Sequence, residues 1–168
     1  MLRLSLLVLL SMLSTWGWTQ SLVVSTHPIY LIAKEVTDGV EEPVLLLGDQ
    51  TGHDVQLTPA HRKAIQDASL VLWLGKVHEA PLDKLLSQNR KAIALLDSGI
   101  LTTLPQRNLR GAALSNTVDS HVWLDPNNAV RIAFFIATLR SQQYPENKAK
   151  YLANARNFGQ RSEERRVG

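Results

Sequence analysis

The chain has 168 residues, enough for one domain but not comfortably for two, and 45% of them are hydrophobic against 20% charged, an ordinary balance for a globular domain. Its formal net charge is +3, and the basic residues are scattered except for three arginines near the end, so the sequence lacks the clustered basic stripe of a nucleic-acid-binding protein. It contains no cysteine, which excludes a disulfide framework and a thiolate metal site. A metal ion would have to be held by histidine and carboxylate groups, which favours zinc or manganese.

Residues 1–19 have the three-part layout of a secretory signal peptide. Arg3 supplies the positive charge, residues 4–13 form an apolar run broken only by serine, and small residues follow at Gly17 and Thr19. A bilayer-spanning helix needs roughly 20 apolar residues, so this run favours a cleaved signal over a membrane anchor. We predict export to a bacterial periplasm, with cleavage after Gly17 or Thr19. A lipid-anchored form is not expected, because the chain offers no cysteine to carry the lipid.

Beyond the signal, short apolar runs alternate with helical patterns. The runs indicate buried strands, and each of the three helices between them begins at a proline, which favours the first helical turn. The order β-α-β-α-β-α-β predicts an α/β fold, with a four-stranded parallel sheet and helices on both faces. The predicted strands are residues 22–25, 44–47, 69–74 and 92–96, and the predicted helices are residues 28–37, 59–67 and 81–88.

The second half of the chain contains a predicted loop and two predicted helices. Residues 99–120 show no clear period and are interpreted as a long surface loop. A helix is expected after it, with Asp125 as N-cap and Pro126 in the first turn. Pro145 separates it from a last helix that begins at Glu146. The apolar side of the first of these helices is predicted to comprise Val130, Ala133, Phe134 and Ala137.

Two of the predicted strands end in loops that carry His53 and Glu79. In a parallel sheet these loops open at the same edge, where α/β proteins place ligands. His121 comes 121 − 53 = 68 positions after His53, so only the fold could bring these two imidazoles together. Neutral imidazole is a good zinc ligand, which makes a metal site one interpretation and two solvated loop histidines the other. Trp123 is expected in the hydrophobic core.

Three further residues near this edge are weaker candidates, namely Asp54, Glu79 and His27. Asp54 either orients His53 or only caps the turn. Glu79 either neighbours a metal ion or stabilises the N-terminus of the next helix through its dipole, and we favour that structural role. His27 ends the first strand and so points toward the same edge. His78 is a loop residue to which the sequence assigns no partner.

Several motifs, taken together in their order, carry a resemblance. They are Gly52-His53-Asp54, the helix start at Thr58-Pro59, Ala68-Ser69-Leu70-Val71, residues 75–79, and His121-Val122-Trp123-Leu124-Asp125-Pro126. The combination resembles the metal-binding receptors of zinc and manganese ATP-binding-cassette importers, the zinc-receptor branch in particular. The resemblance runs from about residue 22 to residue 158. It implies two similar α/β lobes joined by a long helix, with the metal ion in the cleft between them.

The resemblance covers the first lobe and the start of the linking helix. It implies that residues 20–144 are an N-terminal metal-binding lobe, that residues 145–158 begin the linking helix, and that the second lobe with its own ligands is missing. His53 and His121 then become the metal ligands of this lobe. Residues 159–168 depart from the family pattern because they are almost wholly polar or charged, and we interpret them as a non-native or disordered tail.

The function implied is a periplasmic receptor that captures zinc, with manganese as the alternative, and delivers it to the membrane permease of an ATP-binding-cassette importer. The receptor would be monomeric when full length and would bind without catalytic turnover or nucleic acid. A zinc hydrolase using His53, His121 and Glu79 as general base is a competing interpretation, although the sequence has no HExxH-type motif. A metal-linked adhesin built on the same lobe is a third.

The choice between the two metals stays open. Many zinc members carry a histidine-rich loop before the second histidine, whereas residues 102–120 contain no histidine and Asp119 is their one acid. Two imidazoles also leave a four-coordinate ion two ligands short. We therefore expect this chain alone to bind zinc weakly, on the order of micromolar or poorer.

Overall fold

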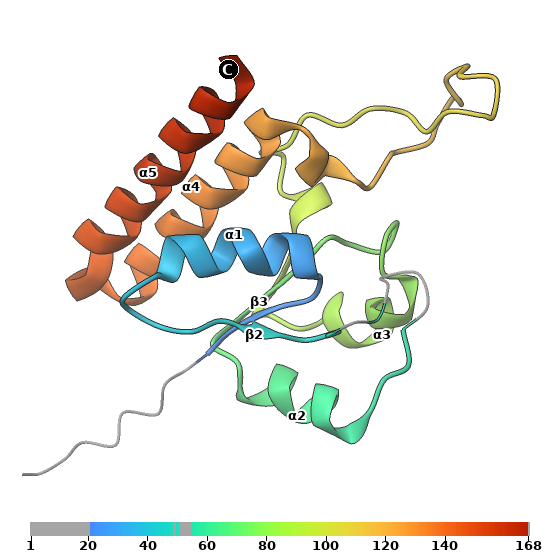
Figure 1. Ribbon diagram of the computed structural model, residues 1–168. Coiled ribbons are helices and arrows are strands. Elements are labelled where there is room, and N and C mark those ends of the chain that lie inside the picture. The colour runs from blue at the N-terminus through green and yellow to red at the C-terminus, as the bar shows by residue number, and fades with distance from the viewer. Residues whose placement is uncertain (1–20, 49, 51–54, 168) are drawn as a thin grey trace, which may run out of the picture.

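A computed structural model describes residues 21–48, 50 and 55–167, and the side chains as far as residue 164 (Figure 1). The predicted α/β class and the four-stranded parallel sheet are both confirmed. The strands are β1 (Leu22–Val24), β2 (Val44–Leu45), β3 (Leu70–Trp73) and β4 (Ala92–Ala94). The α-helices are α1 (His27–Thr37), α2 (Pro59–Asp67), α3 (Asp83–Leu86), α4 (Pro126–Gln143) and α5 (Lys148–Val167).

The strand order in the sheet is β2-β1-β3-β4, with every neighbouring pair parallel. The chain moves outward in one direction from β1 to β2 and in the opposite direction from β3 to β4. The order therefore reverses between β1 and β3. Open α/β sheets bind ligands at such a switch point, outside the carboxyl ends of the strands. The residues that follow β1 and β3 are thus the ones on which a site would be built.

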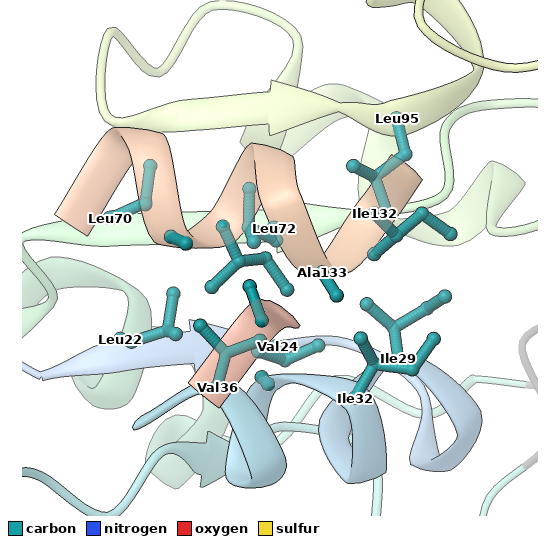
Figure 2. Close-up of a cluster of buried hydrophobic side chains, with 14 of the residues drawn as sticks. Leu22, Val24, Ile29, Ile32, Val36, Leu70, Leu72, Leu95, Ile132 and Ala133 are labelled. Carbon is teal, nitrogen blue, oxygen red and sulfur yellow. The ribbon is translucent and has the colours of Figure 1, made fainter. Parts of the chain in front are cut away.

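Helices cover both faces of the sheet, as predicted (Figure 1). Successive strand residues point to opposite faces, so β1 divides its side chains between two cores. Val23 belongs to the core under α2 and α3, together with Val71, Trp73, Ile65 and Leu86. The other core lies under α1, α4 and α5. Figure 2 shows part of it, where strand residues meet helix residues: Leu22, Val24, Leu70, Leu72, Ile29, Ile32, Val36, Ile132 and Ala133.

Two helix starts follow the caps that the sequence indicates. The Thr58 hydroxyl accepts a hydrogen bond from the His61 backbone N–H (3.3 Å), and the Thr58 N–H donates to Nδ1 of His61 (3.2 Å). This is a capping box in which imidazole takes the usual place of Glu or Gln. At the start of α4, the Asp125 carboxylate accepts from the Asn127 N–H at 2.8 Å. Both helices are therefore fixed at the ends nearest to the candidate loops.

The last two helices differ from the prediction in two ways. Ala133 and Ala137 are buried, but Phe134 is 37% exposed, because α4 packs against both α1 and α5 and its buried side turns toward Ile132 and Ile136. The helix expected over residues 146–158 begins instead at Lys148, after a 3₁₀ turn, and continues to Val167. The charged tail is therefore part of α5 as far as Val167. No helix in the described part of the chain is long and apolar enough to cross a membrane.

Candidate metal centre

The candidate site is formed by the loop after β3 and the segment before α4. His53 and Asp54 lie outside the described residues, so their predicted roles stay predictions. The structure brings three other side chains together. The ring centroids of His78 and His121 are 5.6 Å apart, and Trp123 lies 5.5 Å from His78 and 5.3 Å from His121. Trp123 is only half-buried, so it borders this site and packs on the core with its other side.

The position of His121 is set by the structure on either side of it. A 3₁₀ helix, η3 (Val122–Leu124), begins directly after His121 and leads into α4. On the other side, the long loop is tied to α4, since the Asn128 side chain accepts from the Thr102 N–H (2.9 Å) and donates to the Thr102 carbonyl (2.8 Å). Two fixed segments therefore place the His121 imidazole, although the residue itself is half-exposed.

Asp119 orients the His121 ring. Its Oδ1 accepts from the His121 backbone N–H at 3.0 Å and lies 2.7 Å from Nδ1 of the same residue. The backbone hydrogen bond and the side-chain contact with His121 lower the pKa of Asp119, so the carboxylate is ionised and can only accept. Nδ1 therefore carries the ring proton, and Nε2 is the nitrogen whose lone pair can bind a metal ion. Carboxylate–histidine pairs of this kind orient the ligands of many metal sites.

His78 is the site residue that the sequence did not identify. It is 6% exposed, and its Nδ1 lies 2.8 Å from the hydroxyl of Ser120. These residues are 42 positions apart, so no local spacing could have paired them. Asp119 was not predicted as a site residue either. An acid two residues before a histidine is close enough in sequence to suggest a contact with its ring. The cluster of His78, Asp119, Ser120, His121 and Trp123 is called the edge cluster below.

Glu79 is structural, but not in the way that we expected. It is fully buried, and its Oε2 accepts from the N–H groups of Leu74 (2.7 Å) and Gly75 (3.3 Å). It precedes a three-residue 3₁₀ helix and makes no side-chain hydrogen bond to it, so its observed bonds run back to the end of β3. Burial raises the pKa of Glu79 to about 7, against the lowering effect of Ser25 and of the two backbone groups. Glu79 thus closes the turn after β3.

The remaining histidine candidate lies apart from this cluster. His27 is exposed at the start of α1, where its ring stacks on Tyr30 at a centroid distance of 6.1 Å. Within the described residues, no group of three or more His, Cys, Asp or Glu side chains could hold a metal ion. What the structure shows is two adjacent imidazoles, one of them oriented by a carboxylate, at the carboxyl edge of a parallel sheet.

This fold defines a class, the α/β lobes built on a four-stranded parallel sheet, with two adjacent imidazoles at its carboxyl edge. Residues 22–166 match the family model described as "ZnuA: Zinc-uptake complex component A periplasmic". The chain belongs to this family. The predicted resemblance is confirmed.

Individual relatives agree with the family match. The chain is 28% identical over 185 residues to the high-affinity zinc uptake system protein ZnuA of Brucella abortus, covering 86% of this chain and 55% of that protein. Among solved structures, AdcAII of Streptococcus pneumoniae superposes with a TM-score of 0.66 at 26% identity, over 86% of this chain and 53% of that one. A Mn-bound periplasmic metal binding protein from candidatus liberibacter asiaticus has a TM-score of 0.69 at 21% identity, over 84% and 52%, and so shares the fold. The chain spans about half the length of the curated relatives it matches.

Proposed function

We propose that this chain is the N-terminal lobe of an exported zinc receptor, which captures zinc in the periplasm and delivers it to the permease of an ATP-binding-cassette importer. Residues 1–19 serve as its signal peptide, residues 20–144 form the lobe, and α5 begins the connection to a second lobe. His53 and His121 bind the metal ion. The zinc uptake role of the Brucella abortus relative supports this assignment.

The observation that carries the proposal is the contact between Asp119 and His121. A histidine whose Nδ1–H is held at 2.7 Å by an ionised carboxylate presents Nε2 as a lone-pair donor in one fixed direction. Such an arrangement suits tight binding of an ion without chemistry on it. Glu79, which a hydrolase would need as general base, is instead fully buried and bonded to backbone N–H groups, and this favours a receptor over a hydrolase.

Zinc is the metal that the described donors favour. Imidazole nitrogen suits zinc, whereas manganese prefers sites rich in carboxylate and water oxygens. Manganese remains the alternative cargo of the same site, because a second lobe with carboxylate ligands would change the balance. The proposal therefore assigns zinc on the basis of the histidines of this lobe.

The proposal is tested by titrating the metal-free chain with ZnCl₂ against a chromophoric chelator. His53→Ala and His121→Ala are each expected to weaken zinc binding by at least about tenfold, a loss of about 1.4 kcal/mol or more. The matched control is His61→Gln, because Gln in place of His61 keeps the capping box of α2. Wild-type affinity in both alanine variants would contradict the proposed site. An equal loss in the control would show that the alanine effects are not specific.

A further inference from the structure

His78 is the residue of the edge cluster that the assigned site does not use. A histidine that only fills the core would be surrounded by apolar groups, yet His78 is packed against the two aromatic rings of the edge cluster. Both rings meet it edge-on, with interplanar angles of 89° for His121 and 88° for Trp123. The residue thus combines burial with a place directly beside the ring that we assign to the metal ion.

The separation of the two imidazoles matches that of two ligands on one ion. With a Zn–N distance of about 2.0–2.1 Å and tetrahedral angles, two imidazoles on one zinc have ring centroids about 5 Å apart. The observed distance between the centroids of His78 and His121 is 5.6 Å. The spacing of the two rings is therefore within about 1 Å of that of two imidazoles on a shared ion.

In both rings, Nδ1 is the nitrogen that faces a neighbouring polar side chain. Nδ1 of His121 faces Asp119, and Nδ1 of His78 faces the Ser120 hydroxyl at 2.8 Å. A hydroxyl can accept the Nδ1 proton, and metal-bound histidines generally donate their second ring nitrogen in this way. Metal binding by either ring thus falls to Nε2. Asp119 and Ser120 are consecutive, so one short segment orients both rings.

We infer that His78 is a further zinc ligand of this lobe, oriented by Ser120, and that it biases the site toward zinc over manganese. The bias follows from donor chemistry, because an added imidazole makes the site richer in nitrogen, which suits zinc better than manganese. The inference rests on the proposed metal site and adds a ligand to it. It also predicts tighter zinc binding than a lobe with two ligating imidazoles can reach.

The test compares variants of the whole chain, loaded with ZnCl₂ or MnCl₂ and followed by chelator competition. His78→Asn keeps a polar group that can reach Ser120 but has no atom at the place of Nε2. We expect it to weaken zinc binding by at least about tenfold, as for His121→Ala, and to lower the zinc-to-manganese affinity ratio. His27→Ala is the matched control and should leave both affinities unchanged, because that ring is exposed on α1.

Two outcomes separate this inference from the proposed function. A folded His78→Asn with wild-type zinc affinity, beside a weakened His121→Ala, would overturn the role of His78 and leave the zinc site standing. Wild-type zinc affinity in both His78→Asn and His121→Ala would overturn the metal site itself. A wild-type measurement covers the case in which the variant does not fold. Zinc should move the ¹⁵N resonance of His78 Nε2 to a metal-bound position, and an unchanged resonance in the zinc-loaded protein would overturn the inference.

Discussion

A partly buried glutamate, Glu41, lies at the amino ends of the strands and a fully buried one, Glu79, at their carboxyl ends, and their surroundings differ. Glu41 precedes β2, and its carboxylate accepts from Nε of Arg140 at 2.7 Å, from Nη2 of the same arginine, and from the Tyr151 hydroxyl at 2.9 Å. Arg140 also donates to the side chain of Ser69, which precedes β3, at 2.9 Å. At the amino edge, a partly buried negative charge therefore meets a buried positive charge, and the donors of that arginine are shared with Ser69 and Gln143.

The carboxyl edge is built differently. Glu79 is fully buried, and its Oε2 accepts from two backbone N–H groups. Within the described residues, Glu79 Oε1 and the hydroxyls of Ser25 and Thr26 have no partner in good hydrogen-bonding geometry, although Ser25 lies close enough to lower the pKa of Glu79. A buried polar atom without a partner costs about 1–3 kcal/mol. Among the described residues, the amino edge thus holds an ion pair with its hydrogen bonds made, whereas the carboxyl edge holds buried polar atoms without partners beside the edge cluster.

The largest expected effect is at the amino edge. Arg140→Met removes the buried cation and leaves the partly buried Glu41 charge unpaired, which should lower the free energy of unfolding by about 3 kcal/mol or more. Urea unfolding of the metal-free chain measures it. Arg161→Met is the control, because its ion pair with Glu35 joins two half-exposed side chains and should be worth about 0–1 kcal/mol. Equal losses of unfolding free energy in the two variants would show that the Arg140 network contributes no more to stability than an exposed ion pair does.

The next effect concerns Glu79 and depends on pH. Its pKa is about 7 in the folded chain against an ordinary 4.5, so the folded state holds a proton that the unfolded state releases between these values. The stability that Glu79 contributes therefore falls as pH rises from about 4.5 to 7, by about 3 kcal/mol in all. Glu79→Gln should unfold at higher urea than wild type at pH 8 and should lose this advantage at pH 4.5. A pH-independent difference would contradict the account.

The third effect concerns zinc binding at the carboxyl edge. Asp119→Asn replaces the carboxylate that orients His121 with a neutral amide, which should weaken zinc binding by about 10- to 100-fold, or about 1.4–2.7 kcal/mol. Chelator competition measures it. Asp67→Asn, at an exposed acid of α2 paired with Lys63, is the control and should bind as wild type. Unchanged affinity in Asp119→Asn would mean that Asp119 does not orient a ligand.

The smallest effect returns to Glu41. Tyr151→Phe removes one of its hydrogen bonds and keeps the ion pair, so the loss in unfolding free energy should be about 1 kcal/mol. Tyr30→Phe is the matched control, because that hydroxyl donates to the exposed Glu42 at 2.8 Å and its loss should be close to zero. A loss in Tyr151→Phe as large as that in Arg140→Met would show that the hydroxyl, rather than the cation, holds Glu41.

The fold was predictable because its signals are local. Apolar runs placed all four strands, and the prolines at positions 59 and 126 marked the first residues of α2 and α4. The buried side of α4 was less predictable, because a helix that packs on two neighbours has no single apolar stripe. The helical state of the charged tail was missed for a related reason, since α5 packs against α4 and the sequence does not show that contact.

The site was predictable only where a motif carried it. His121 was identified through the segment that runs from it to Pro126, and Asp125 through its position as an N-cap. His78 was missed, because its partner Ser120 comes from a loop without periodicity 42 positions away. The side chain of Glu79 turns back toward β3, and no sequence pattern distinguishes that direction from the forward one. Contacts between loops that are distant in sequence depend on the folded sheet, so the sequence alone left them open.

The most direct test of the metal site is anomalous diffraction at the zinc edge from crystals of the chain grown with ZnCl₂. We predict a zinc peak about 2.0–2.1 Å from His121 Nε2, with the contact between Nδ1 and Asp119 retained. A zinc peak bound only elsewhere, such as at the exposed ring of His27, would contradict the assignment of the carboxyl edge as the metal site.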